Sequence, residues 1–265
     1  MSEPARAPAV QAVVLVHGMW GAPQDWQWVR DRLAARGVEV VVPDLVSHRV
    51  PGAGLLDDVE VVKAALRSLG RGPIVVAGWS YGCDVAGISA AGHESVARLV
   101  YVSSVPQPVQ PHTRDSSLLD GNPAIVWDEE GQFLPRGGWW NEDPGLTAAA
   151  RAFLDSHPRR PVGRRTLSDP VPAAAWESIP TTVLLGDSDP FNDQQNVALA
   201  RQRVADVRIV ACNHFIPFNL PDLVADVILE GAAGLTASPR NVLHSRTNRQ
   251  NSRYSGVKFC TTELF

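Results

Sequence analysis

The stretch IVVAGWSYGCDVAG, at residues 74–87, contains the pattern GxSxG with Ser80 at its centre. In this pattern the serine lies on a tight turn from a strand to a helix, so that its hydroxyl stands above the sheet. The flanking Gly78 and Gly82 have a steric reason, because such a turn brings neighbouring backbone too close for side chains. A β-branched run precedes Ser80 and small helical residues follow it, as the pattern requires. The stretch therefore predicts a nucleophilic serine at position 80.

A serine hydroxyl needs a base to remove its proton, and a carboxylate to orient that base. Among seven histidines, His214 lies just past the last predicted strand, where such a base is expected. The alternative for His214 is a buried core histidine or one that leads a helix. His17 also follows a strand, and we expect it to brace the next loop. We expect surface exposure for the remaining histidines, His48, His93, His112, His157 and His244.

The segment LLGDSDPF supplies two carboxylates, Asp187 and Asp189, after the penultimate predicted strand. Asp189 lies deeper in the loop and precedes Pro190, which fixes the turn that would aim the carboxylate at the histidine. We therefore prefer Asp189, with Asp187 as a turn-capping side chain. The chain order Ser80, Asp189, His214 is the order expected of one fold class.

The oxyanion that develops in such a reaction needs backbone donors. The turn at the serine offers the N–H of Tyr81, and HGMW, after the first strand, offers the N–H of Met19. Aromatic residues near these positions and farther along the chain either line a pocket or pack the core. The candidates for substrate binding are Trp20, Trp79, Trp139 and Trp140.

The elements that must position these groups alternate between short β-branched runs and helical patterns. This alternation predicts an α/β fold with a mostly parallel sheet and helices on both faces. Near-continuous apolar strands are expected when both faces are covered. Strands are predicted at residues 13–18, 38–45, 73–80, 96–105, 181–189 and 207–214, and helices at 26–37, 57–70, 81–93, 193–204 and from 220.

The periodicity breaks down between residues 106 and 179, a stretch rich in Pro, Gly and Trp with its clearest helix at 146–157. Because a structureless loop of that length is uncommon, we predict an inserted, partly helical lid within a domain that covers 10–234. Residues 235–265 are rich in Arg, Asn, Ser and Thr. We expect a disordered or non-native tail there; the alternative is an arm that binds nucleic acid or another partner.

Composition and charge indicate a globular protein and disfavour several other classes of protein. The 265 residues are 45% hydrophobic and 20% charged, which is ordinary for a globular domain. Without an apolar run of membrane-spanning length or a secretion signal, we expect a soluble, cytoplasmic protein. Three distant cysteines indicate neither a disulfide framework nor a zinc site. The net charge of −4 becomes −8 when the +4 of the tail is removed, which argues against a nucleic-acid groove.

Four segments, VLVHGMWG, GWSYG, LLGDSDP and NHFIPFNLPDLVADVI, together resemble the α/β-hydrolases over residues 13–231. The opening HGMWGAPQDW is similar to small esterases of the methylesterase and hydroxynitrile-lyase group. The resemblance implies that the serine, carboxylate and histidine form a triad and that the two amides form the oxyanion hole. Carried over to this chain, these positions are Ser80, Asp189, His214, Met19 and Tyr81.

The chain departs from that group at three places. It has DLVSHRVPGAG where the family commonly has GHG after DL, and Asn213 stands where Gly or Ser usually precedes the histidine. Phe215 follows the histidine, whereas relatives that cleave cyanohydrins carry a lysine there, which disfavours a lyase. A serine nucleophile also disfavours epoxide hydrolase and dehalogenase chemistry.

We therefore expect a serine hydrolase, an esterase or lactonase, that cleaves a carboxylic ester or lactone of a hydrophobic small molecule and needs no metal or organic cofactor. One alternative is an acyltransferase or biosynthetic cyclase with the same triad. Another is a ligand-binding receptor on the same scaffold. The substrate and the oligomeric state stay open.

Overall fold

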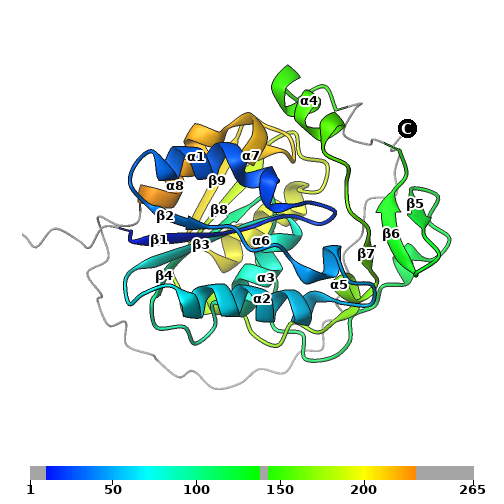
Figure 1. Cartoon of the computed structure of the whole chain (residues 1–265), viewed down its shortest axis with the longest axis horizontal. Coiled ribbons are helices and arrows are strands. Elements are labelled where there is room, and N and C mark those ends of the chain that lie inside the picture. Colours follow the sequence, from blue (N-terminus) through cyan, green and yellow to red (C-terminus); the bar gives the residue numbers. More distant parts are fainter. Residues whose placement is uncertain (1–9, 138–142, 231–265) are drawn as a thin grey trace, which may run out of the picture.

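The computed structural model describes residues 10–137 and 143–230, which form a six-stranded parallel sheet with helices around it (Figure 1). The strand order is β2-β1-β3-β4-β8-β9, and every neighbouring pair is parallel. This arrangement confirms the predicted fold class. The strands are β1 (Ala12–Val16), β2 (Glu39–Val41), β3 (Ile74–Trp79), β4 (Val96–Val102), β8 (Thr181–Gly186) and β9 (Asp206–Val210).

Helices cover both faces of the sheet, and the sheet separates two hydrophobic cores. Successive residues of β1 enter opposite cores: Val14 and Val16 belong to one, Val13 and Leu15 to the other. Because strand side chains alternate between faces, a strand covered on both sides must be apolar throughout. The first core is closed by α2 (Leu55–Ser68), α3 (Tyr81–Ser89) and α6 (Gln194–Arg203), and the second by α1 (Gln27–Ala34), α7 (Ile216–Asn219) and α8 (Pro221–Glu230) (Figure 1).

Local sequence explains where several helices begin and end. Helix α1 is followed by Gly37 at φ 77, a left-handed conformation that glycine adopts without steric cost. The carboxylate of Asp57 accepts the N–H of Gly54 at 2.9 Å and caps α2. At α6, Asp193 accepts the N–H of Asn196 at 2.8 Å. The observed boundaries lie within a few residues of the predicted ones.

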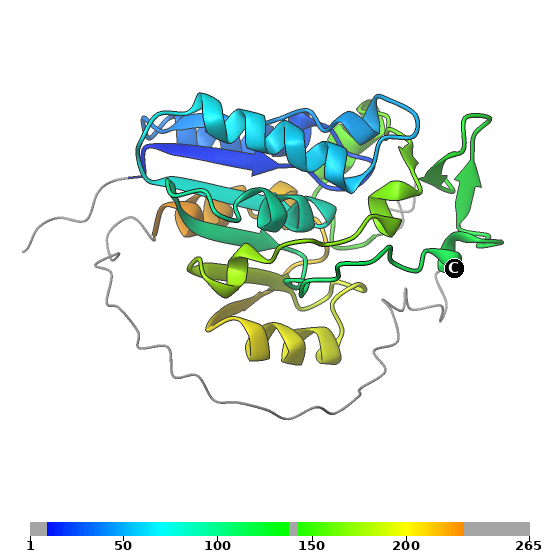
Figure 2. The same ribbon diagram turned by 90° about the horizontal axis from the view of Figure 1, so that it is seen from below.

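The described part of the insertion at residues 106–179 lies mostly beyond the carboxyl ends of the parallel strands, and its last residues run back alongside the sheet to the start of β8 (Figures 1 and 2). It contains the predicted helix, α4 (Ala148–Ser156), and the short α5 (Arg165–Ser168). It also contains an antiparallel sheet of β5 (Ile125–Trp127), β6 (Gln132–Pro135) and β7 (Val162–Gly163). The sequence did not predict this sheet, because strands this short show no readable alternation. Short 3₁₀ helices occur at Pro23–Trp26, Val46–His48, Ser117–Leu119 and Ala175–Glu177.

Some predictions fall outside the described residues. Trp139, Trp140 and the tail at 235–265 lie there, so the domain boundary at 234 stays a prediction. Within the part of the chain that the structure describes, no helix combines the length and apolar character needed to cross a bilayer.

Helix α3 packs directly against β1 through Gly82. A Cβ at Gly82 would lie 2.3 Å from the carbonyl oxygen of Val16 and 2.6 Å from that of His17. We expect Gly82→Ala to lower the free energy of unfolding by about 3 kcal/mol, because backbone inside a sheet cannot move aside. Urea unfolding measures this change.

The matched control is Gly70→Ala. The nearest atom to a Cβ there is the Nε2 of Gln11 at 3.8 Å, an ordinary van der Waals contact. We expect a change within about 0.5 kcal/mol for this variant. Equal effects of the two substitutions would contradict the close packing of α3 on β1.

Candidate active site

Ser80 lies between β3 and α3 with backbone angles φ 54 and ψ −124. This region is strained for a residue with a side chain, so neighbouring contacts must hold it. The N–H of Ser80 donates to Val102 O at 2.8 Å, and its carbonyl accepts from the N–H of Cys83 at 2.9 Å. A Cβ at Gly78 would lie 2.4 Å from Gly82 O, which explains the first glycine of the motif. The turn expected from GxSxG is therefore present.

Asp189 and His214 meet on the loops that follow β8 and β9. Nδ1 of His214 lies 2.9 Å from Oδ2 of Asp189, and the two side chains are 8% and 0% exposed. Asp189 also accepts the backbone N–H of Phe191 at 2.9 Å and the side-chain amide of Asn192 at 2.5 Å. The carboxylate is therefore held in place from three sides.

Competing effects act on the pKa of Asp189. Burial alone would raise it, but the charge and hydrogen bond of His214, with the donors from Phe191 and Asn192, together bring the pKa below its ordinary value. An ionised carboxylate only accepts hydrogen bonds, so Nδ1 of His214 carries the proton. This leaves Nε2 as the basic nitrogen.

Trp79 connects the strand of the serine to the loop of the histidine. Its indole N–H donates to the carbonyl of His214 at 2.9 Å, and Ser103 Oγ donates to the same carbonyl, also at 2.9 Å. The Trp79 side chain is buried in the second core, with its ring 5.7 Å from that of His214. The structure thus gives Trp79 a packing role, and substrate binding by it stays a prediction.

Asp187 occupies a different position from Asp189. It is exposed, and its Oδ1 accepts the N–H of Cys212 at 3.2 Å. The close approach of the two loops requires Gly186, because a Cβ there would lie 2.2 Å from Cys212 O. Asp189, and not Asp187, therefore lies beside His214.

The Met19 amide is oriented by the carbonyl of the peptide to which it belongs. That carbonyl, Gly18 O, accepts from the N–H of Gly21 at 3.2 Å and lies 3.1 Å from Nδ1 of His17. Because the C=O and N–H of a trans peptide point in opposite directions, these contacts set the direction of the Met19 N–H. Tyr81 is the first residue of α3, where N–H groups have no acceptor within the helix.

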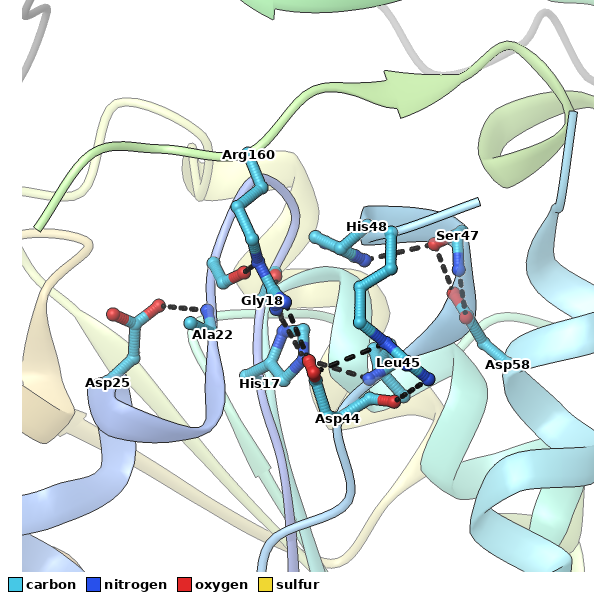
Figure 3. Close-up of polar contacts among 12 residues, drawn as sticks. His17, Gly18, Ala22, Asp25, Asp44, Leu45, Ser47, His48, Asp58 and Arg160 are labelled. Atoms are coloured by element: carbon cyan, nitrogen blue, oxygen red, sulfur yellow. Dashed lines mark hydrogen bonds and ion pairs between the residues drawn. The ribbon is translucent and has the colours of Figure 1, made fainter. Parts of the chain in front are cut away.

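His17 is a fully buried neutral ring that braces this loop (Figure 3). The N–H of Leu45 donates to its Nε2 at 3.2 Å, so Nδ1 carries the proton and donates to Gly18 O. Burial lowers the pKa of His17 to about 4. The expectation that His48 is exposed is wrong: it is 4% exposed, 4.7 Å from the His17 ring, and burial lowers its pKa well below the ordinary value.

Asp58, which was not predicted as a site residue, anchors the side chain of Tyr81. The Asp58 carboxylate accepts the Tyr81 hydroxyl at 2.7 Å. It also accepts the Ser47 hydroxyl at 2.6 Å and the Ser47 N–H at 2.9 Å (Figure 3). Burial raises the pKa of Asp58 above its ordinary value. The sequence signal that could have identified Asp58 is its position as an acidic residue on the apolar face of the helix predicted at residues 57–70.

Trp20 joins the loop after β1 to the insertion. Its indole N–H donates to Phe133 O at 3.1 Å, and its ring meets that of Phe133 edge to face at 5.9 Å. Trp20 is half-buried, and its part in substrate binding stays a prediction. Among the described residues, no cluster of three or more His, Cys, Asp or Glu is arranged to hold a metal ion.

A parallel sheet with a serine on a strained turn, and an aspartate–histidine pair at its carboxyl edge, is the architecture of an α/β-hydrolase. The chain belongs to the alpha/beta hydrolase family, whose model matches residues 13–227. It is 28% identical over 249 residues to lipase LipV of Mycobacterium tuberculosis, across 82% of this chain and 91% of that protein.

Solved structures show the same fold. The methylesterase MES16 from Arabidopsis has a TM-score of 0.64 at 17% identity, across 83% of this chain and 98% of that one. A pyrethroid hydrolase from Sphingobium faniae JZ-2 has a TM-score of 0.60 at 22% identity, across 84% of this chain and 97% of that one. The family and the lipase relative support a hydrolase.

The burial of His17 makes stability depend on pH. Its pKa is about 4 in the folded protein against an ordinary 6.5, so the unfolded chain binds more protons between these values. The stabilisation from His17 is therefore complete above pH 6.5 and is lost as the pH falls toward 4. We expect the unfolding free energy of the wild type, minus that of His17→Asn, to fall by roughly 3 kcal/mol between pH 7 and pH 4.

Urea unfolding of both proteins across this range measures the difference. Burial raises the pKa of Asp84 to about 6, so its contribution to the unfolding free energy grows as the pH falls. Because Asp84 is present in both proteins, this contribution cancels in the difference between them. A difference that stays constant with pH would show that His17 is not held neutral in the folded state.

Proposed function

We propose that this protein is a serine hydrolase that cleaves a carboxylic ester or lactone of a hydrophobic small molecule through an acyl-enzyme. The observation that carries the proposal is the 2.9 Å contact between His214 and Asp189, on loops packed against the strand that leads to Ser80. A buried, ionised carboxylate beside a histidine serves a reaction in which the histidine gains a proton, because it stabilises the imidazolium.

In the proposed reaction, Nε2 of His214 removes the proton from Ser80, and the serine oxygen attacks the ester carbonyl carbon. The N–H groups of Met19 and Tyr81 donate to the oxyanion that forms. His214 then protonates the departing alcohol, and the acyl group stays on the serine. A water molecule, deprotonated by the same histidine, releases the acid and restores the enzyme.

Two kinds of observation support an ester or lactone of hydrophobic character. Around the base the surroundings are aromatic, with the ring of Phe191 4.9 Å from that of His214 and half-buried Met19 and Trp20 on the loop after β1. Apolar walls with few polar groups favour apolar substrates. The similar proteins described above are, by their names, a lipase, a methylesterase and a pyrethroid hydrolase.

A fluorophosphonate probe tests the nucleophile, because it reacts only with a serine whose hydroxyl is activated. We expect a single adduct on the peptide that contains Ser80, located by mass spectrometry, and none in Ser80→Ala. Ser188→Ala, which removes an exposed serine at the same edge of the sheet, is the control and should still be labelled. Absence of the Ser80 adduct in the folded wild type would refute the proposal.

A matched pair of substitutions tests the carboxylate. Asp189→Asn reverses the hydrogen bond to Nδ1 and favours the wrong tautomer of His214, so we expect kcat for p-nitrophenyl butyrate to fall by roughly 10³-fold or more. Asp187→Asn keeps an oxygen that can accept the N–H of Cys212, and its kcat should fall less than about tenfold. The opposite ranking would assign the triad carboxylate to Asp187.

A further inference from the structure

Residues 158–161 of the insertion cross the loop that carries the Met19 amide, which we call the β1 loop (residues 17–25). Arg160 holds two consecutive carbonyls of this loop: its backbone N–H donates to Trp20 O at 2.9 Å, and its Nε donates to Gly21 O at 2.7 Å. A single residue of the insertion thus binds the backbone of the turn that follows Met19.

This turn is strained and needs outside support. The N–H of Gly21 donates to Gly18 O, which closes a four-residue turn whose third residue is Trp20 at φ 59. A turn with a positive φ at its third position favours glycine, and a residue with a Cβ there costs roughly 1–2 kcal/mol. Such a conformation persists only when surrounding contacts fix it, and Arg160 supplies two of them.

Arg159 holds the other end of the β1 loop. Its guanidinium forms a two-pronged ion pair with Asp25, with both N–O distances at 2.9 Å and with side chains that are 8% and 1% exposed. Asp25 in turn accepts the N–H of Ala22 at 3.1 Å (Figure 3). Gly21 lies so close to this carboxylate that a Cβ there would be 2.3 Å from Asp25 Oδ2.

The rest of the Arg160 guanidinium connects the β1 loop to the loop that follows β2. Nη1 donates to Asp44 at 2.7 Å, and Nη2 lies 3.3 Å from Nε2 of His17, the ring whose other nitrogen holds Gly18 O (Figure 3). Arg160 therefore contacts both sides of the peptide that presents the Met19 amide: the turn after it and the histidine before it.

We propose that Arg159 and Arg160 are positioning residues for the oxyanion hole, so that docking of the insertion onto the β1 loop sets the direction of the Met19 N–H. This inference rests on the proposed function, since it assigns a catalytic use to that amide. The insertion then does more than cover the site: the segment 158–161 completes it. The side-chain contacts that place these two arginines are with Asp25, Gly21, Asp44 and His17, and we therefore expect their loss to act on the β1 loop rather than on the pairing of Asp189 with His214.

Arg165 provides a matched comparison within the same insertion. Its guanidinium also bonds the insertion to the body of the domain, through Asp57 at 3.0 Å and Gly52 O at 3.1 Å, and it pairs with Asp169. These partners lie outside the β1 loop. Loss of Arg165 weakens the attachment of the insertion but leaves the contacts of the Met19 turn in place.

The test compares Arg160→Met and Arg165→Met, each of which keeps an apolar stem and loses the guanidinium donors. With p-nitrophenyl butyrate, we expect kcat of Arg160→Met to fall about 10- to 100-fold, because both acylation and deacylation pass through an oxyanion. KM should change less than about threefold, since substrate binding does not require the oxyanion contact. The rate of phosphonylation of Ser80 by the fluorophosphonate should fall with kcat.

For Arg165→Met we expect kcat within about threefold of the wild type, even where urea unfolding shows that stability has fallen as far as in Arg160→Met. Arg160→Lys keeps the positive charge but replaces the planar guanidinium by a single ammonium group, so that fewer of the contacts can form. Its kcat should lie between those of the wild type and Arg160→Met. If Arg160→Met does not fold, Arg160→Lys against Arg165→Lys gives the same comparison.

Two outcomes overturn the inference while the proposed function stands. One is an active wild type with unchanged kcat in the folded Arg160 variant. The other is an equal fall of kcat in the Arg160 and Arg165 variants, which would assign the effect to general attachment of the insertion. A wild type that neither hydrolyses the ester nor is labelled at Ser80 refutes the proposed function, and the inference falls with it.

Discussion

The site depends on one close contact, that of the first turn of α3 with the end of β1. Gly82 lies against the carbonyl oxygens of Val16 and His17, with no room for a Cβ. This approach requires the chain to reverse sharply after β3, which forces Ser80 to a positive φ and lifts its side chain out of the sheet. The same contact brings the first amides of α3 beside the loop that carries the Met19 amide. One steric constraint therefore fixes the backbone of the proposed nucleophile and brings together the two amides that we propose to form the oxyanion hole.

Around this contact, buried carboxylates each hold a different part of the site. Asp189 orients His214, Asp58 holds the side chain of Tyr81, and Asp25 joins the β1 loop to Arg159. A charge or polar group buried without partners is costly, so each of these groups constrains its neighbours as strongly as they constrain it. These buried carboxylates thus lie at the candidate site, where side chains and strained backbone must be held in fixed positions. The apolar cores on the two faces of the sheet supply the rigid frame beneath it.

Much of the fold was predictable because its strands are buried on both faces. Such strands must be apolar along their whole length, and the runs before Gly78 and Gly186 are of this kind. The carboxyl ends of parallel strands lie at one edge of a sheet, which is why the turn at Ser80 and the loops of Asp189 and His214 could be expected at the same edge although they lie far apart in the chain. The antiparallel sheet of the insertion escaped prediction, since its strands are too short to show a period. His48 was misplaced for a related reason: nothing in its local sequence marks a loop that is covered by the insertion.

The sequence by itself determined the parallel sheet, the glycine-flanked turn at Ser80 and the order of the candidate triad. All of these follow from local patterns: apolar period, small residues at tight turns and polar residues at strand ends. Only the tertiary structure decided that Asp189 rather than Asp187 meets His214, that Asp58 anchors Tyr81, and that Arg159 and Arg160 dock on the β1 loop. These contacts join residues that lie as many as 143 positions apart in the chain. The sequence around either residue contains no pattern that predicts such a contact, because the packing of distant segments, and not local propensity, brings the two residues together.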